Sequence, residues 1–175
     1  LGFAYQQQGK FKEAANAFGR AKALVGDADA ELLGYEAEAL YLAKDYDRAL
    51  LEAQKARALY PNDPDLAGLE AAILRSQGDM KAALAVVDAM REKAPNDSRV
   101  LAQVAQFYQR AKRYPDAENA LRKVAEIKPQ DVATLFQLGA VLERQKRHDE
   151  AEAAFRDALR VDPDSAPVLT YLGYL

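Results

Sequence analysis

Small and apolar residues recur along this chain with a fixed period. Four prolines stand 34 residues apart: Pro61, Pro95, Pro129 and Pro163. A column of alanines keeps the same register, with one extra residue in the connector at Asp29: Ala14, Ala49, Ala83, Ala117 and Ala151. A small side chain at one site in every repeat indicates that two helices approach closely there, because a larger one would overpack the contact. A fixed period of this length is typical of a repeat architecture.

Two further columns complete the core that this pattern predicts. One is mostly small, and we expect it to meet the alanine column where the two helices of a repeat cross: Gly2, Ala37, Ala71, Ala105, Gly139 and Gly173. The other is mostly large: Phe18, Ala53, Val87, Leu121 and Phe155. From Leu135 to Leu142 the apolar residues follow the three- and four-residue spacing of one helical face. The pattern therefore predicts two amphipathic helices in each repeat.

Residues with known preferences for helix ends stand where these helices should begin and end. The predicted N-caps are Asp29, Asp63, Asp97, Asp131 and Ser165. Pro64 and Pro115 suit the first turn of a helix, where the missing N–H costs nothing. Gly9 and Gly78 favour a left-handed turn between the two helices. The other repeats carry lysine at that site, so we expect that the turn does not require glycine: Lys44, Lys112 and Lys146.

The arrangement resembles the tetratricopeptide repeat, whose period is 34 residues. Residues 132–165 match its pattern best, at Leu135, Leu138, Gly139, Leu142, Ala151, Phe155, Ala158 and Pro163. The family's tryptophan is replaced by Leu33, Ala67, Leu101, Leu135 and Leu169. The resemblance implies an all-α, right-handed α-solenoid of helix-turn-helix repeats, about five with the start of a sixth. We expect a single array over residues 1–175, divided into 1–28, 30–63, 64–97, 98–131, 132–165 and 166–175.

Composition narrows the range of functions. The 175 residues include 24 Lys and Arg against 27 Asp and Glu, which gives a formal net charge of −3. A weak negative charge makes no case for nucleic acid, which usually needs a clustered basic face. No apolar run approaches the length of a membrane span, so we expect no direct membrane insertion. Cysteine is absent, which excludes a disulfide framework and a thiolate metal site.

Side chains that could carry chemistry have structural interpretations. The single histidine, His148, shares a column with apolar and aromatic residues, so we expect it to pack at the start of a second helix. Five carboxylates stand at the starts of second helices, where negative charge complements the helix dipole: Glu13, Asp47, Asp116, Asp149 and Glu150. Glycines are scattered singly, so there is no phosphate-cradling loop. We therefore expect no catalysis, no cofactor and no metal site.

The resemblance implies that the first helix of each repeat lines a concave inner wall. By register, we expect eight residues there to contact a partner: Glu38, Tyr41, Arg75, Arg99, Gln106, Arg110, Phe136 and Arg144. The lysine and asparagine clamp of the family's chaperone-tail binders is missing, which argues against that role. Arginines gather in the later repeats and favour an acidic peptide or helix as the ligand. The alternative is that these arginines are solvated or pair with neighbouring acids such as Glu143.

These observations predict a non-catalytic scaffold or adaptor that binds a peptide or helical segment in its concave groove. An alternative is a positioning or assembly module of a larger enzyme or of a bacterial envelope or secretion complex. Self-association through apolar open ends is a third hypothesis. The Ala-, Arg- and Asp-Pro-rich style resembles bacterial proteins, and we expect a soluble protein of the bacterial cytoplasm or periplasm. Both ends fall within a repeat and lack polar caps, so we expect a fragment of a longer protein.

Overall fold

The computed structural model describes residues 1–26 and 29–173, and every regular element within them is a helix. The helices are α1 (Gly2–Gln7), α2 (Phe11–Val25), α3 (Ala30–Leu42), α4 (Tyr46–Leu59), α5 (Pro64–Ser76), α6 (Met80–Lys93), α7 (Ser98–Arg110), α8 (Tyr114–Ile127), α9 (Val132–Arg144), α10 (His148–Val161) and α11 (Ala166–Leu172). The predicted all-α fold class is confirmed.

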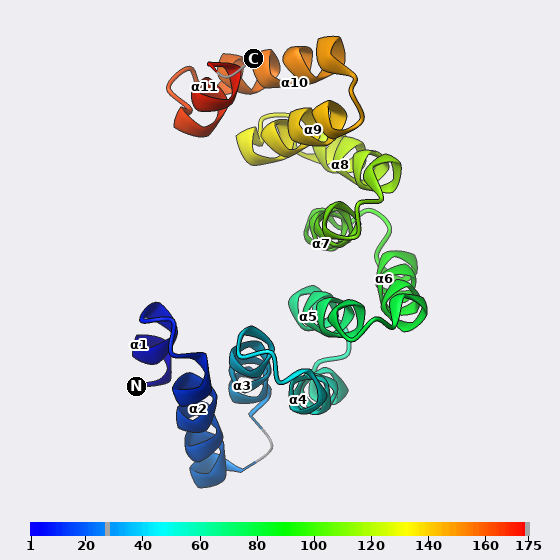
Figure 1. Ribbon diagram of the computed structural model, residues 1–175. Helices are drawn as coiled ribbons and strands as arrows, with labels where there is room; N and C mark the ends of the chain where they lie inside the picture. Colours follow the sequence, from blue (N-terminus) through cyan, green and yellow to red (C-terminus); the bar gives the residue numbers. More distant parts are fainter. Residues whose placement is uncertain (27–28, 174–175) are drawn as a thin grey trace. The chain divides into compact units, whose positions relative to one another are not determined.

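Each full 34-residue repeat holds one pair of helices, as the pattern predicts. The chain forms two compact units, an N-terminal unit (Leu1–Met90) and a C-terminal unit (Arg91–Leu175). In the N-terminal unit α2 packs against α3, α3 against α4, and α4 against α5 (Figure 1). In the C-terminal unit each helix from α7 to α11 likewise packs against the next. The single array over residues 1–175 stays a prediction.

The alanine column lies at the centre of the helix pairs. Its five members are at most 1 % exposed: Ala14, Ala49, Ala83, Ala117 and Ala151. Such complete burial at one register position explains why no larger side chain stands there, because protein interiors are close-packed and an added methylene forces neighbours apart.

The second small column lies against the large column at its two glycines, Gly2 and Gly139. A Cβ on Gly2 would lie 2.6 Å from the ring of Phe18, and one on Gly139 would lie 2.5 Å from the ring of Phe155. At these two glycines the nearest side chain therefore belongs to the large column. The expected contact with the alanine column stays a prediction. In the three repeats whose large column holds Ala53, Val87 or Leu121, the small column holds alanine. The side chains of the small and large columns therefore fill the same space between the helices: the small column holds glycine where the large column holds phenylalanine.

The five predicted residues all stand at helix N-cap positions, and three of them make side-chain cap bonds. Asp29, Asp63 and Asp97 each accept hydrogen bonds from two backbone N–H groups in the first turn of the following helix. Asp131 stands at the N-cap position of α9 but makes no such bond, because its carboxylate accepts from the Thr134 hydroxyl instead. Ser165 at the start of α11 also makes no side-chain cap bond. Both residues therefore stand at the predicted N-cap position, but neither side chain bonds to a backbone N–H there.

The turn between the two helices of a repeat adopts a left-handed backbone in all five repeats. Gly9 and Gly78 have φ of 70° and 89°. Lysine occupies the same conformation at Lys44, Lys112 and Lys146, with φ of 63°, 58° and 62°. Glycine is not required at this turn position, as expected, although all five repeats keep the left-handed conformation there. It costs an L-residue about 1–2 kcal/mol.

Buried ion pairs join successive repeats in the N-terminal unit. The Lys22 ammonium on α2 lies 2.7 Å from a carboxylate oxygen of Glu36 on α3 and 2.8 Å from one of Glu52 on α4. Arg57 pairs with Glu70 at the equivalent columns of the next junction. Burial acts to lower the pKa of Lys22, but the hydrogen bonds and charges of both glutamates outweigh it and raise that pKa. One bridge therefore recurs at two junctions.

Candidate interaction surface

Three of the eight predicted contact residues lie in the N-terminal unit. Glu38 and Tyr41 stand three residues apart on α3, so they share one side of that helix. Glu38 is exposed, whereas Tyr41 is half-buried, and its ring centroid lies 5.9 Å from that of Tyr46 on α4. Arg75 is half-buried in the last turn of α5. Only Glu38 of this set presents an exposed side chain.

Three more of the predicted residues lie along α7 in the C-terminal unit. Arg99, Gln106 and Arg110 are separated by seven and four residues, so they fall on one face of the helix. All three are exposed. The opposite face of α7 is buried and apolar and includes Leu101, Val104 and Tyr108. The polar face of α7 is therefore exposed to solvent, and α7 packs against α8.

The last two predicted residues lie on α9 and differ in their surroundings. Arg144 is exposed in the last turn. Phe136 is half-buried, and its ring centroid lies 5.8 Å from that of Phe155 on α10 and 5.9 Å from that of Tyr171 on α11. Aromatic pairs at such separations are favourable in tilted or edge-on arrangements. Phe136 is therefore an internal packing residue that still keeps part of its ring exposed.

Tyr171 is a residue of this surface that the sequence analysis missed. Its hydroxyl donates a hydrogen bond of 2.7 Å to the Glu143 carboxylate on α9. Burial and the neighbouring Glu143 raise the pKa of Tyr171 to about 12. The repeat register contained the signal, because Tyr35 occupies the same column and its ring lies 5.6 Å from that of Phe18. The Tyr171–Phe155 pair, at 4.7 Å, repeats that contact.

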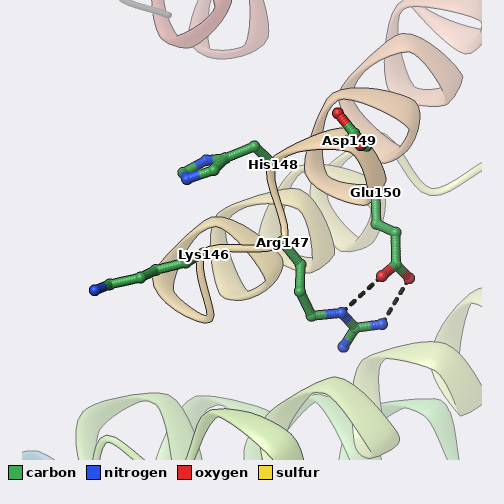
Figure 2. Close-up of a pocket in the computed structure, with 5 residues that line it drawn as sticks. All are labelled: Lys146, Arg147, His148, Asp149 and Glu150. Carbon is green, nitrogen blue, oxygen red and sulfur yellow. Dashed lines mark hydrogen bonds and ion pairs between the residues drawn. The ribbon is translucent and has the colours of Figure 1, made fainter.

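Residues 146–150 line an open hollow of about 310 Å³ at the turn between α9 and α10 (Figure 2). His148 begins α10 as expected but is exposed, so its predicted role in packing is wrong. Figure 2 shows Lys146 and His148 pointing away from the Arg147–Glu150 ion pair, whose atoms approach to 2.6 Å. Asp149 and Glu150 lie in the first turn of α10, as the dipole argument predicts.

Glu118 on α8 is a second residue that the sequence analysis missed. It is 7 % exposed and accepts hydrogen bonds from Gln145, at 2.8 Å, and from Arg147, at 2.5 Å. Arg122, one turn along α8, donates a third at 2.9 Å. Burial alone would raise the pKa of Glu118, but these three donors outweigh it and lower that pKa. The cluster fixes the turn between α9 and α10 against α8.

Other kinds of site receive little support from the described residues. Among residues 1–26 and 29–173, no three His, Cys, Asp or Glu side chains are grouped so that they could hold a metal ion. None of the described helices is both long and apolar enough to cross a membrane.

The paired helices and the 34-residue register define a helical-repeat protein. Three family models, each described as tetratricopeptide repeat, match residues 1–64, 40–107 and 97–164. Together these matches run from residue 1 to residue 164. The chain belongs to the tetratricopeptide repeat family. No curated protein matches the chain.

Solved structures of other repeat proteins share the fold. TTC0263, a thermophilic tetratricopeptide repeat protein of Thermus thermophilus, is 19% identical with a TM-score of 0.73, over 99% of this chain and 94% of that one. MamA from Desulfovibrio magneticus RS-1 is 22% identical with a TM-score of 0.64, over 94% and 93%. YrrB, described as having an unusual peptide-binding site, is 17% identical with a TM-score of 0.63, over 99% and 89%. At these identities the likeness shows the α-solenoid fold alone.

Proposed function

We propose that this chain is a protein-interaction scaffold that binds a peptide or helical segment of a partner along the first helices of its repeats. Tetratricopeptide repeat arrays are extended surfaces without deep catalytic pockets. The fold that the chain shares with YrrB, whose description names a peptide-binding site, is consistent with this role. We infer no catalytic activity of the chain's own.

The observation that carries the proposal is the exposed polar face of the first helices in the C-terminal unit. Arg99, Gln106 and Arg110 share one face of α7, and Arg144 ends α9. The opposite face of α7 is apolar and buried. Phe136 adds an aromatic surface that is partly exposed.

The ligand that fits this face carries carboxylates and at least one apolar side chain. Guanidinium groups make paired hydrogen bonds to carboxylates, and such charge-assisted bonds are stronger than neutral ones. The small neighbours Ala102 and Ala140 leave room for a ligand backbone to approach the helices. Aromatic and arginine side chains are also the residues that most often dominate the energy of an interface. We therefore propose an acidic peptide or helix as the partner segment.

Capture of partners from lysate of the source organism tests the proposal, with the whole chain as bait. A double variant, Arg110→Glu and Arg144→Glu, should lose the partner that the unmodified chain captures. The matched control is Arg156→Glu with Arg160→Glu, because those two arginines are exposed on α10, which is a second helix. Equal capture by all three proteins would contradict binding through the first helices. An assembly-module role remains the alternative hypothesis, and capture of a multi-subunit complex would favour it.

A further inference from the structure

The turns between paired helices change in composition between the two units. In the C-terminal unit they read Arg-Ala-Lys-Arg at residues 110–113 and Arg-Gln-Lys-Arg at residues 144–147. The equivalent turns of the N-terminal unit, at residues 7–10, 42–45 and 76–79, carry at most one cation each. Lys and Arg number 14 against 13 acids in the C-terminal unit but 10 against 14 in the N-terminal unit. A basic tetrapeptide thus recurs with the repeat, and the fold by itself does not require it.

The last arginine of each tetrapeptide has a structural role. Arg113 lies 2.7 Å from the Asp116 carboxylate and 5.2 Å from the centre of the Tyr108 ring. Arg147 bonds to Glu118 and Glu150. These contacts hold each turn against the start of the following helix, so the charges of Arg113 and Arg147 are already balanced within the protein.

The lysines differ from these arginines. Lys112 and Lys146 are exposed at the left-handed position of the turn, and neither makes an ion pair within the described part of the chain. Figure 2 shows the Lys146 side chain extending away from the Arg147–Glu150 pair. Arg144, two residues before Lys146, is also exposed and has no carboxylate within ion-pair distance among the described residues. Among the described residues, these three cations therefore form no ion pair.

The separation of the two turns sets the spacing of the ligand groups that they could bind. Gln109 near the end of α7 donates a 3.2 Å hydrogen bond to Gln137 on α9, so the two helices are neighbours. Neighbouring helices lie about 10 Å apart. Residues seven apart on a helix are separated by about 10 Å along its axis, because each residue rises about 1.5 Å. Carboxylates repeated every seven residues along a helical ligand would therefore match two turns on neighbouring helices.

We propose that Lys112, Lys146 and Arg144 form a basic turn edge that binds the acidic side chains of a partner's helical segment. The inference deepens the proposed function and rests on it, since the same segment would lie along α7 and α9. Carboxylates of the protein stand close to this edge, at Glu143, Asp149 and Glu150. They would repel the continuous phosphates of a nucleic acid or the dense headgroups of an anionic membrane. Separate acidic side chains on a peptide can instead meet the cations one at a time.

The left-handed lysines allow a test that does not weaken the fold. Lys112→Gly with Lys146→Gly removes two charges, and glycine adopts this backbone without strain. The matched control is Lys44→Gly, which removes the same side chain from the same turn position of a repeat without flanking arginines. A loss of binding in the double variant therefore cannot be assigned to a strained turn.

The probe is a fluorescent amphipathic peptide of about 20 residues, long enough to form a helix, with glutamate at every seventh position. A peptide of the same composition in scrambled order is its control. Fluorescence anisotropy at low salt should show the double variant binding the probe about three- to tenfold more weakly than the unmodified chain, while Lys44→Gly binds it unchanged. Raising salt from about 50 to 200 mM should narrow this difference.

Three results would overturn the inference. The double variant could bind the ordered probe as tightly as the unmodified chain. The scrambled peptide could bind equally well. A single-stranded oligonucleotide or a vesicle rich in phosphatidylglycerol could bind more tightly than the peptide and lose affinity in the double variant. The proposed function is tested separately, by partner capture with Arg110→Glu and Arg144→Glu. If that variant loses the partner while the lysine variant binds the probe normally, the scaffold stands and the role of the turn lysines falls.

Discussion

Gly139 on α9 faces the ring of Phe155 on α10. This contact predicts that Gly139→Ala destabilises the protein when Phe155 is present and stabilises it when residue 155 is leucine. A Cβ at residue 139 would lie 2.5 Å from the ring. The ring cannot turn away, because it is fully buried and the Tyr171 ring lies 4.7 Å from it. Overpacking costs about 1–3 kcal/mol, whereas alanine is favoured over glycine within a helix by about 1 kcal/mol. Gly139→Ala should therefore lower the free energy of unfolding by up to about 2 kcal/mol.

Phe155→Leu removes the obstacle, and the chain supplies the precedent. Ala105 and Leu121 hold the same two columns in the repeat 98–131. Phe155→Leu alone should cost about 1–2 kcal/mol, since a full truncation to alanine costs about 3–5 kcal/mol and leucine keeps much of the volume. In that background Gly139→Ala should become stabilising by up to about 1 kcal/mol, because only the helix preference remains.

Urea unfolding of the four proteins, followed by far-ultraviolet circular dichroism, measures this coupling. Repeat arrays need not unfold in one step, so amide exchange within α9 and α10 reports the same cycle locally. Ala140→Gly, one residue further along α9, measures the helix preference alone. Effects of Gly139→Ala and Phe155→Leu that simply add, within about 0.5 kcal/mol, would refute the argument that this ring limits the space at residue 139.

Charges and turn residues give three further predictions. Lys22→Met should lower the free energy of unfolding by about 1–3 kcal/mol in urea, because Glu36 then keeps only Arg48, at 4.0 Å, and Glu52 keeps only Lys55, at 3.0 Å; an unchanged free energy of unfolding would contradict this. In the folded protein the pKa of Glu118 lies below its ordinary value of 4.5. The ionised carboxylate therefore contributes its full stabilisation of the fold above that pH, and this contribution is lost as the pH falls through the lower folded-state pKa. Acid unfolding of Glu118→Gln should accordingly show a shallower pH dependence, and an unchanged profile would rule out this role. Lys44→Gly should raise the thermal midpoint through a gain of about 0.5–1 kcal/mol, because the relief of backbone strain exceeds the larger entropy of glycine in the unfolded chain. Lys44→Ala should bring no gain.

The repeat period made most of the fold predictable from sequence, because each column receives several independent observations. Five buried alanines in one register leave little freedom in how a helix pair packs. The left-handed turn was predictable from Gly9 and Gly78, and the register transfers it to the three lysines. Pro64 marks the start of α5 and Pro115 the start of α8. Local chemistry and register agree at these positions.

Predictions failed where a side chain had a competing partner that the period does not encode. Asp131 has the same register as Asp97, but the nearby Thr134 hydroxyl takes its carboxylate. His148 shares a column with aromatic residues, yet a polar side chain at the first residue of a helix can turn to solvent at no cost. The Glu118 cluster joins residues 27 and 29 positions apart. The repeat register does not predict that contact, because it depends on which charged side chains face each other across two helices.

The candidate interaction surface was only partly predictable. Register assigns Arg99, Gln106 and Arg110 to one face of α7, and the structure leaves all three exposed. Register alone did not show that Phe136 packs against Tyr171, because that contact needs the identity of the residue on the following helix. Whether an aromatic residue such as Phe136 is exposed or packed therefore depends on the side chains of the neighbouring helices.

Site-specific photo-crosslinking tests most directly whether the first helices bind the partner. A photoreactive side chain would replace Gln106, which is exposed on α7, and in a second protein Asn119, which is exposed on α8. Both proteins would be irradiated in lysate of the source organism. We expect a covalent partner adduct from residue 106 and none from residue 119. An adduct from residue 119 alone would contradict this expectation and would place the partner on the second helices.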